Sequence, residues 1–166
     1  MLKALLALLE FIRLGITEAD LVEKCLDLQY KAGIDGYWCK SLPALVLTGN
    51  HTTLAISSPQ YNPSNVPIQE NDLVTIYLNP STASYCGDYV CSFYVENGVA
   101  RHSPLFNQEF IAGAHALGHL HAMLIEVAHI DMTFEELYQL IHKKTNDWVL
   151  NSWTISCTEW RKICSI

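Results

Sequence analysis

The chain carries the same helix–turn–helix pattern twice, and this repeat limits its fold more than any other feature. The matched positions are Glu10 with Glu126, Thr17 with Thr133 and Leu21 with Leu137, a constant offset of 116 residues. In each copy a threonine begins the second helix, and an acid three residues later, Asp20 or Glu136, completes a capping box. The repeat predicts two related α+β halves around one core.

A β-hairpin is expected between the two repeats. The run from Asn71 to Leu78 alternates and is rich in β-branched and aromatic residues, which is typical of a strand. Asn79-Pro80-Ser81 supplies turn chemistry, and a second strand is expected from Tyr85 to Val95 with Asp88 inside it. Few residues follow the second repeat, so its strands are expected to be short or absent, which leaves a sheet edge to protect.

Composition narrows the classes of partner. The chain has 166 residues, half of them hydrophobic, with a formal net charge of −7. An acidic surface argues against nucleic acid, because phosphate binding needs clustered lysine and arginine. We find no secretory signal, no apolar stretch long enough to span a bilayer, and no C-x-x-C pair among the six cysteines. These features predict a reduced, cytoplasmic protein with no membrane partner.

Three stretches of the chain carry a family resemblance: GITEADLV, PALVLTGNHTTLAIS and IQENDLVTIYLNPSTASYCGDYVCSFYVENG. They resemble the pita-bread metallopeptidases, the family of methionine aminopeptidase, aminopeptidase P, prolidase and creatinase, and the likeness extends over roughly residues 2–146. It is strongest to the aminopeptidase P and prolidase branch. The resemblance implies an α+β fold in which helices cover a curved, mainly antiparallel sheet. We expect one truncated pita-bread domain over 1–166, with a first half 1–100 and an incomplete second half 110–166.

The resemblance also implies where a metal site should be. Active members hold two metal ions with two aspartates of the hairpin, then a histidine and two glutamates of the second half, and the metals activate a water. The second aspartate corresponds to Asp88, but the first corresponds to Tyr77, a neutral phenol at pH 7. The substrate-binding histidine falls at Ile56, and His51 is close but out of register. The three later ligands have no recognisable counterpart.

Other groups of candidate site residues indicate a function less clearly. His115 and His119 are four residues apart on an expected helix and form a candidate metal pair, although a polar helix face that carries imidazoles is the favoured interpretation. Asp88 is a residual metal ligand or a carboxylate that pairs with a neighbour. A cysteine nucleophile would need a base such as His102 or His51 within hydrogen-bond reach, and no motif indicates one.

Two functions follow as hypotheses. The first is a non-catalytic, aminopeptidase P- or prolidase-like protein that binds a peptide or protein partner, has no cofactor and forms a homo-oligomer. The alternative is a metal-dependent aminopeptidase or Xaa-Pro peptidase with a rebuilt site for Mn²⁺, Co²⁺ or Zn²⁺. Tyr77 at a ligand position favours the first, because the chemistry depends on water activated by the metals.

Overall fold

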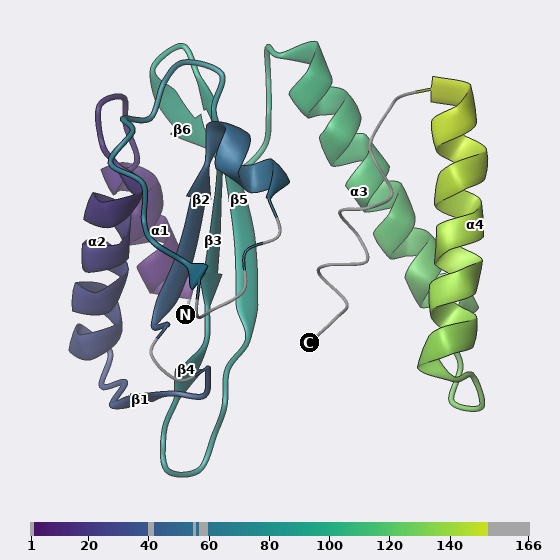
Figure 1. Ribbon diagram of the computed structural model, residues 1–166, viewed down its shortest axis with the longest axis horizontal. Helices are drawn as coiled ribbons and strands as arrows, with labels where there is room; N and C mark the ends of the chain where they lie inside the picture. The colour runs from purple at the N-terminus through teal and green to yellow at the C-terminus, as the bar shows by residue number, and fades with distance from the viewer. Residues whose placement is uncertain (1, 40–41, 55, 57–59, 153–166) are drawn as a thin grey trace. The chain divides into compact units, whose positions relative to one another are not determined.

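The chain divides into two compact units, Met1–Asn107 and Gln108–Ile166 (Figure 1). The structure is a computed structural model that describes residues 2–39, 42–54, 56 and 60–152. The division lies close to the expected boundary between the two halves. That both units form a single domain over 1–166 stays a prediction.

The first unit opens with the expected helix pair. Helix α1 is Leu2–Phe11 and helix α2 is Glu18–Lys31. The predicted capping box is confirmed, because the Asp20 backbone N–H donates to Thr17 Oγ1 at 3.2 Å and the Thr17 N–H donates to Asp20 Oδ2 at 2.9 Å. Gly15, with φ +85°, takes the left-handed conformation that redirects the chain between the helices.

Two small antiparallel sheets follow. Strands β2 (Ala44–Thr48), β3 (Leu73–Leu78), β5 (Tyr89–Glu96) and β6 (Val99–Arg101) form a sheet in the order β2-β3-β5-β6, and β1 (Gly36–Tyr37) pairs with β4 (Pro80–Ser81). A 3-10 helix, η1 (Gly49–Thr53), continues directly from β2. The turn Asn97-Gly98 has positive φ at both residues, as a two-residue hairpin requires.

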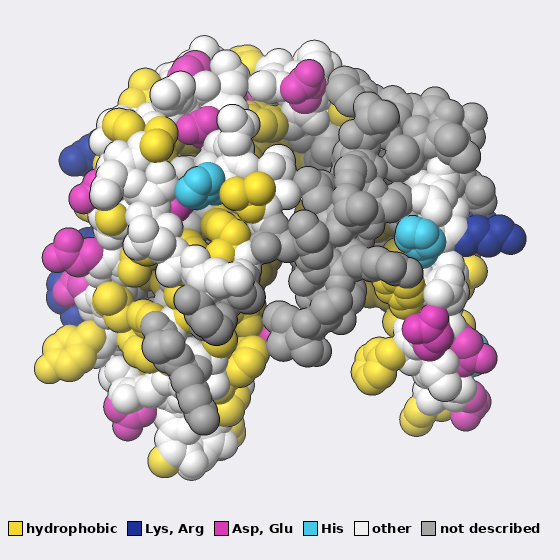
Figure 2. All heavy atoms as spheres, in the orientation of Figure 1, with side chains coloured by type: hydrophobic (Ala, Val, Ile, Leu, Met, Phe, Trp, Pro, Cys, Tyr) yellow, Lys and Arg dark blue, Asp and Glu magenta, His cyan; other side chains and the backbone are white. Residues whose placement is uncertain are grey.

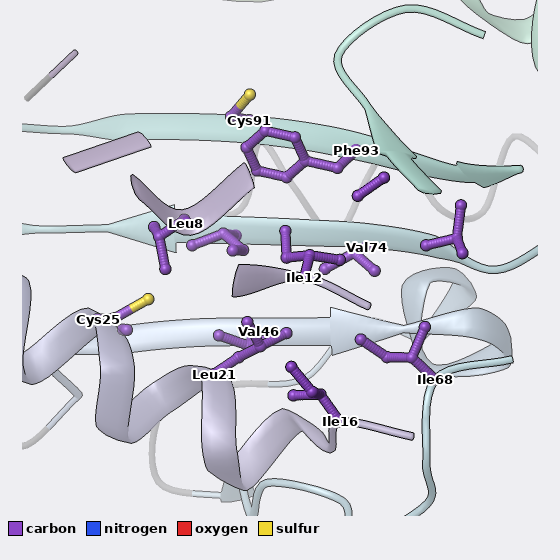
Figure 3. Close-up of a cluster of buried hydrophobic side chains, with 14 of the residues drawn as sticks. Leu8, Ile12, Ile16, Leu21, Cys25, Val46, Ile68, Val74, Cys91 and Phe93 are labelled. Atoms are coloured by element: carbon purple, nitrogen blue, oxygen red, sulfur yellow. The ribbon is translucent and has the colours of Figure 1, made fainter. Parts of the chain in front are cut away.

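The core lies between the helix pair and one face of the four-stranded sheet. Figure 3 shows Leu8 and Leu21, from the helices, among Val46, Val74 and Phe93 of the strands. Alternate residues of β3 are buried, so the run LVTIYL has one face in this core and one face outside it. In helix α1 the row of apolar side chains that faces the core is narrower than the number of leucines suggests, because Leu6 is exposed.

The hairpin differs from the prediction at its tip. The second strand begins at Tyr89 rather than Tyr85, so Asp88 lies directly before β5 and not inside a strand. Long-range bonds hold the intervening segment: the Gly87 N–H donates to the Pro80 carbonyl at 2.7 Å, and the Trp38 indole Nε1 donates to the Gly87 carbonyl at 2.9 Å. The sequence between the strands forms a structured loop that carries Asp88.

A buried carboxylate, Glu18, ties four segments together. Its side chain is fully buried at the first turn of α2. It accepts from the Thr48 N–H at 2.8 Å, the Thr48 hydroxyl at 3.2 Å and the Ser64 N–H at 2.7 Å. His51 Nδ1 of η1 lies 3.1 Å from Glu18 Oε1. Buried backbone N–H groups need partners, so Glu18 fixes the end of β2, η1 and the following loop.

A second buried carboxylate, Glu96, fixes the chain as it leaves the sheet. It accepts hydrogen bonds from the backbone N–H groups of Leu105, Phe106 and Asn107 at 2.8, 3.0 and 2.7 Å. Burial alone would raise the pKa of Glu96, but these three bonds and the positive charge of Arg101 outweigh it and hold the pKa below its usual value. Glu96 therefore remains ionised at neutral pH and orders the segment before the second unit.

The second unit consists of helices α3 (Gln108–Val127) and α4 (Phe134–Ser152). The Thr133–Glu136 capping box is confirmed by N–H bonds of 2.8 and 3.2 Å. By length and composition alone, α3 is apolar enough to cross a membrane, so the expectation that no stretch has this length is wrong. Length and composition also fit a core helix of a soluble protein, and α3 carries three histidines, which are rare in the middle of spanning helices.

We predict that Glu18→Ala lowers the free energy of unfolding by about 3 kcal/mol or more, because the Thr48 and Ser64 N–H groups each lose a partner at about 1–3 kcal/mol. Urea denaturation measures the change. The matched control is Glu23→Ala, an exposed glutamate of the same helix, which should change stability by less than about 0.5 kcal/mol. Equal losses for the two variants would contradict the role of Glu18.

Candidate functional site

Tyr77 and Asp88 lie together on the hairpin. Tyr77 belongs to the half-buried series of β3, on the sheet face opposite the core, and pairs in register with Leu45 of β2 and Val90 of β5. Asp88 directly precedes β5, and its carboxylate lies close enough to the Tyr77 hydroxyl to raise the pKa of that phenol. The two residues that the resemblance implies as an altered ligand pair are therefore neighbours, and their correspondence to metal ligands stays a prediction.

The electrostatics of the pair keep the phenol protonated. Burial, the negative charge of Asp88 and the hydrogen bond to it raise the pKa of Tyr77 to about 12, and Cys39 adds a smaller contribution. A neutral phenol carries no negative charge to offset that of a cation, so it is a poor replacement for a bridging carboxylate. The pair is therefore suited to hydrogen bonding rather than to bridging two cations.

Trp38 and Cys39 lie near this pair, and Cys86 precedes Asp88 by two residues in the chain. Trp38 bonds to Gly87 beside Asp88, Cys39 is half-buried, and Cys86 is exposed. Both thiols are free, as are Cys25 and Cys91 among the described residues, while Cys157 and Cys164 lie outside them. Across the described ranges, no group of three or more His, Cys, Asp and Glu side chains is arranged to hold a metal ion. The donor set does not fit a two-metal centre.

His51 and Ile56, the other expected cleft residues, do not join the pair. The His51 ring is bonded to Glu18, and its side chain is 38% exposed. Ile56 is half-buried between residues that are not described. Within the described chain, no interaction links either of them to Tyr77 or Asp88. His51 has a structural role that the alignment of motifs did not indicate.

The pair His115 and His119 lies on α3 in the second unit, and both side chains are exposed. The two residues lie four positions apart on one helix, as predicted, but in the described chain they belong to no group of three metal donors. Metal binding by this pair stays a prediction.

A cysteine–histidine contact is present, although no motif indicated it. Cys91 Sγ lies 3.5 Å from His102 Nε2, and the His102 ring meets Phe93 edge-on at 6.1 Å between centroids. Burial raises the pKa of Cys91, with a small opposing effect of the Tyr89 hydroxyl, so the thiol stays protonated at neutral pH. Cys91 lies in the core and His102 is exposed, so the contact joins a buried, protonated thiol to a surface imidazole and is not an activated nucleophile.

The helices, the sheet and this hairpin have the arrangement of the pita-bread metallopeptidase fold, and solved structures of that fold are similar to the chain. The chain is similar to the X-Pro aminopeptidase of Thermotoga maritima, with 17% identity, a TM-score of 0.69, and coverage of 88% of this chain and 37% of that one. The prolidase of Pyrococcus furiosus is 19% identical, with a TM-score of 0.68, and the match covers 93% of this chain and 41% of that one. An alanine variant of Escherichia coli aminopeptidase P is 15% identical, with a TM-score of 0.70, and the match covers 97% of this chain and 33% of that one.

Residues 2–148 match the model of metallopeptidase family M24, and the chain belongs to that family. No curated protein matches the chain. The chain spans about two fifths or less of the length of the three solved structures above. The family and the α+β fold with antiparallel sheets, both expected from the sequence motifs, are therefore confirmed.

We predict that Tyr77→Asp creates Mn²⁺ binding, because it places a second carboxylate beside Asp88 and removes the competing hydroxyl. Two carboxylates on one hairpin should give a dissociation constant of roughly 10⁻⁴–10⁻³ M, typical of weak oxygen-ligand sites. Titration calorimetry measures it.

The matched control is Thr75→Asp, which adds a carboxylate on the same face of β3 one pleat away. Thr75 pairs with Ser92 and not with a carboxylate. This control should bind Mn²⁺ at least about tenfold more weakly, a difference of about 1.4 kcal/mol. Equal affinities for the two variants would show that Tyr77 does not occupy the ligand position.

Proposed function

We propose that this chain is a non-catalytic member of its metallopeptidase family that binds an extended peptide or a segment of a protein partner. The observation that carries the proposal is the neutral Tyr77 hydroxyl beside Asp88, at the position where the family resemblance implies a bridging carboxylate. Without metals to lower the pKa of a water and polarise a carbonyl, peptide hydrolysis by this family's chemistry has no nucleophile.

The outer face of the four-stranded sheet is the binding surface in this proposal. The face combines apolar and hydroxyl side chains from three neighbouring strands: Leu45, Thr75, Tyr77, Val90 and Ser92. These residues pair across the strands and form one contiguous surface, in which Val90 is exposed and the other four are half-buried. Pockets and faces with apolar walls and a few polar groups are typical of peptide-binding sites.

The proposal also includes the kind of ligand and the cellular location of the protein. Prolidase and X-Pro aminopeptidase are the names of similar structures, so peptides with a prolyl bond are the first ligands to test. The net charge of −7 favours protein or peptide partners over nucleic acid, and we place the protein in the cytoplasm.

The test is a paired assay of binding and hydrolysis. Fluorescein-labelled Xaa-Pro peptides are titrated with the protein and followed by anisotropy, and the same mixtures with Mn²⁺, Co²⁺ or Zn²⁺ are analysed for cleavage by chromatography. We expect binding without cleavage. We also expect Tyr77→Ala to weaken binding at least about fivefold, about 1 kcal/mol, because it removes the central side chain of the surface.

Tyr30→Ala is the matched control, because Tyr30 is an 80% exposed tyrosine of α2, away from the sheet face. It should leave peptide binding unchanged. Metal-dependent cleavage by the wild-type chain would replace this proposal with the rebuilt Xaa-Pro peptidase. Equal binding by the Tyr77 and Tyr30 variants would place the ligand elsewhere.

A further inference from the structure

One stretch of strand β5, the residues Tyr89–Ser92, has no strand beside it on the β6 side. Strand β6 pairs only with Tyr94, Val95 and Glu96, whereas β3 pairs with every residue from Tyr89 to Tyr94. The ladder on the β6 side therefore ends at Tyr94. No other described strand continues it.

The direction of the backbone groups on this edge follows from bonds of the neighbouring residues. The Val95 N–H donates to the Asp72 carbonyl and the Val95 carbonyl accepts from the Asn71 N–H, both at 3.0 Å, so Val95 faces the β3 side. Alternate residues of an antiparallel strand face opposite edges. Val90 and Ser92 therefore direct their N–H and C=O groups to the open edge, as Tyr94 does toward β6.

The other edge of the same sheet is closed by side chains. On β2 the Val46 N–H donates to the Tyr61 hydroxyl at 3.1 Å, and that hydroxyl donates to the Val46 carbonyl at 2.9 Å. Glu18 accepts from the Thr48 N–H two residues on. Native sheets protect edges with blocking side chains, charges or proline. The stretch Tyr-Val-Cys-Ser has no charge and no proline, so the β5 edge lacks this protection.

From these observations we propose that the open edge of β5 pairs with the same edge of a second copy of this chain, antiparallel, about a two-fold axis at Val90. Val90 then faces Val90, Tyr89 faces Cys91, and Asp88 faces Ser92. All outward backbone groups of Val90 and Ser92 gain partners. Val90, an apolar side chain that is 59% exposed, packs against its counterpart.

This register is selected by sterics and charge. A shift that centres the axis on Cys91 would bring Asp88 of one copy opposite Tyr94, a position that Arg101 already holds. With the axis at Val90 the pairing stops at Ser92, before β6 begins. The two Asp88 carboxylates are then about four residues, roughly 13 Å, apart along the ladder, beyond the Debye length of about 8 Å at physiological salt.

The interface is small, so the dimer is weak. A ladder of five residues per copy buries less than the roughly 1,200 Å² of a standard stable interface. We expect a dissociation constant of roughly 10–100 µM, about 5–7 kcal/mol of association free energy. The joined sheet would be continuous through both copies.

The test is a charge exchange at the two-fold position. Val90→Lys and Val90→Glu each place two like charges opposite each other, so each variant should be monomeric in sedimentation velocity at concentrations where the wild-type chain dimerises. An equimolar mixture of the two variants places Lys opposite Glu and should restore the dimer. Only direct Val90–Val90 apposition predicts this rescue.

Val99→Lys is the matched control, since Val99 is a 48% exposed valine on β6 that pairs with Glu96 and lies outside the stretch Tyr89–Ser92. It should dimerise like the wild-type chain. Thermal melts of every variant establish that each is folded. A wild-type chain that is monomeric at 200 µM (about twice the weakest dissociation constant expected), a Val90→Lys variant that still dimerises, or a mixture that stays monomeric would each overturn the proposal.

These outcomes do not depend on peptide binding. A wild-type monomer that takes up an extended peptide along β5 would overturn the second copy as the occupant of this edge. Loss of peptide binding with an intact dimer would overturn the proposed function and leave the interface standing.

Discussion

The buried carboxylate of Glu18 is the interaction on which the first unit depends. Helices and strands of this unit pack through apolar side chains, which set no exact register by themselves. Glu18 adds directional bonds from the start of α2 to the end of β2 and to the loop at Ser64. It also holds His51 of η1. A buried carboxyl group is costly unless its oxygens have hydrogen-bond donors, and here both oxygens have them.

The hairpin is held by bonds that involve the side chain of neither Tyr77 nor Asp88. Buried residues of β3 and β5 anchor it to the helices, and the Trp38–Gly87 and Pro80–Gly87 bonds hold its tip. A tyrosine at position 77 fits the outer face of the sheet, and its hydroxyl lies near Asp88. Fold and metal chemistry are therefore separable in this hairpin, and a fold by itself licenses no activity.

Local patterns were predicted well, and contacts between distant residues were not. The capping boxes at Thr17 and Thr133 and the alternation of β3 follow from short-range rules, so the sequence was enough to place them. The start of β5 was placed four residues early, because the tip is held by β1 and Trp38, which are far away in sequence. Glu18 was missed as a site residue, because an acid in the first helical turn is common and nothing local marks its burial.

The candidate site shows the same division. Spacing and family resemblance predicted Tyr77 and Asp88 as an altered ligand pair, which stays a prediction, and the structure places the two side chains near each other. The same approach could not show that His51 bonds to Glu18 or that Cys91 meets His102, since those pairs join elements separated by 33 and 11 residues. The sequence predicted only that a sheet edge would need protection. The pairing register of β5 with β3 and β6 shows where the open stretch of β5 lies.

Metal stoichiometry tests the central claim most directly. The purified chain would be dialysed separately against Mn²⁺, Co²⁺ and Zn²⁺, and bound metal per chain counted, with Asp88→Ala as the control. The account predicts no stoichiometric metal in the wild-type chain and no difference from the Asp88→Ala variant, because Tyr77 leaves Asp88 as the single carboxylate of the pair. One or two ions per chain, lost in the Asp88→Ala variant, would contradict it and show that the site has been rebuilt.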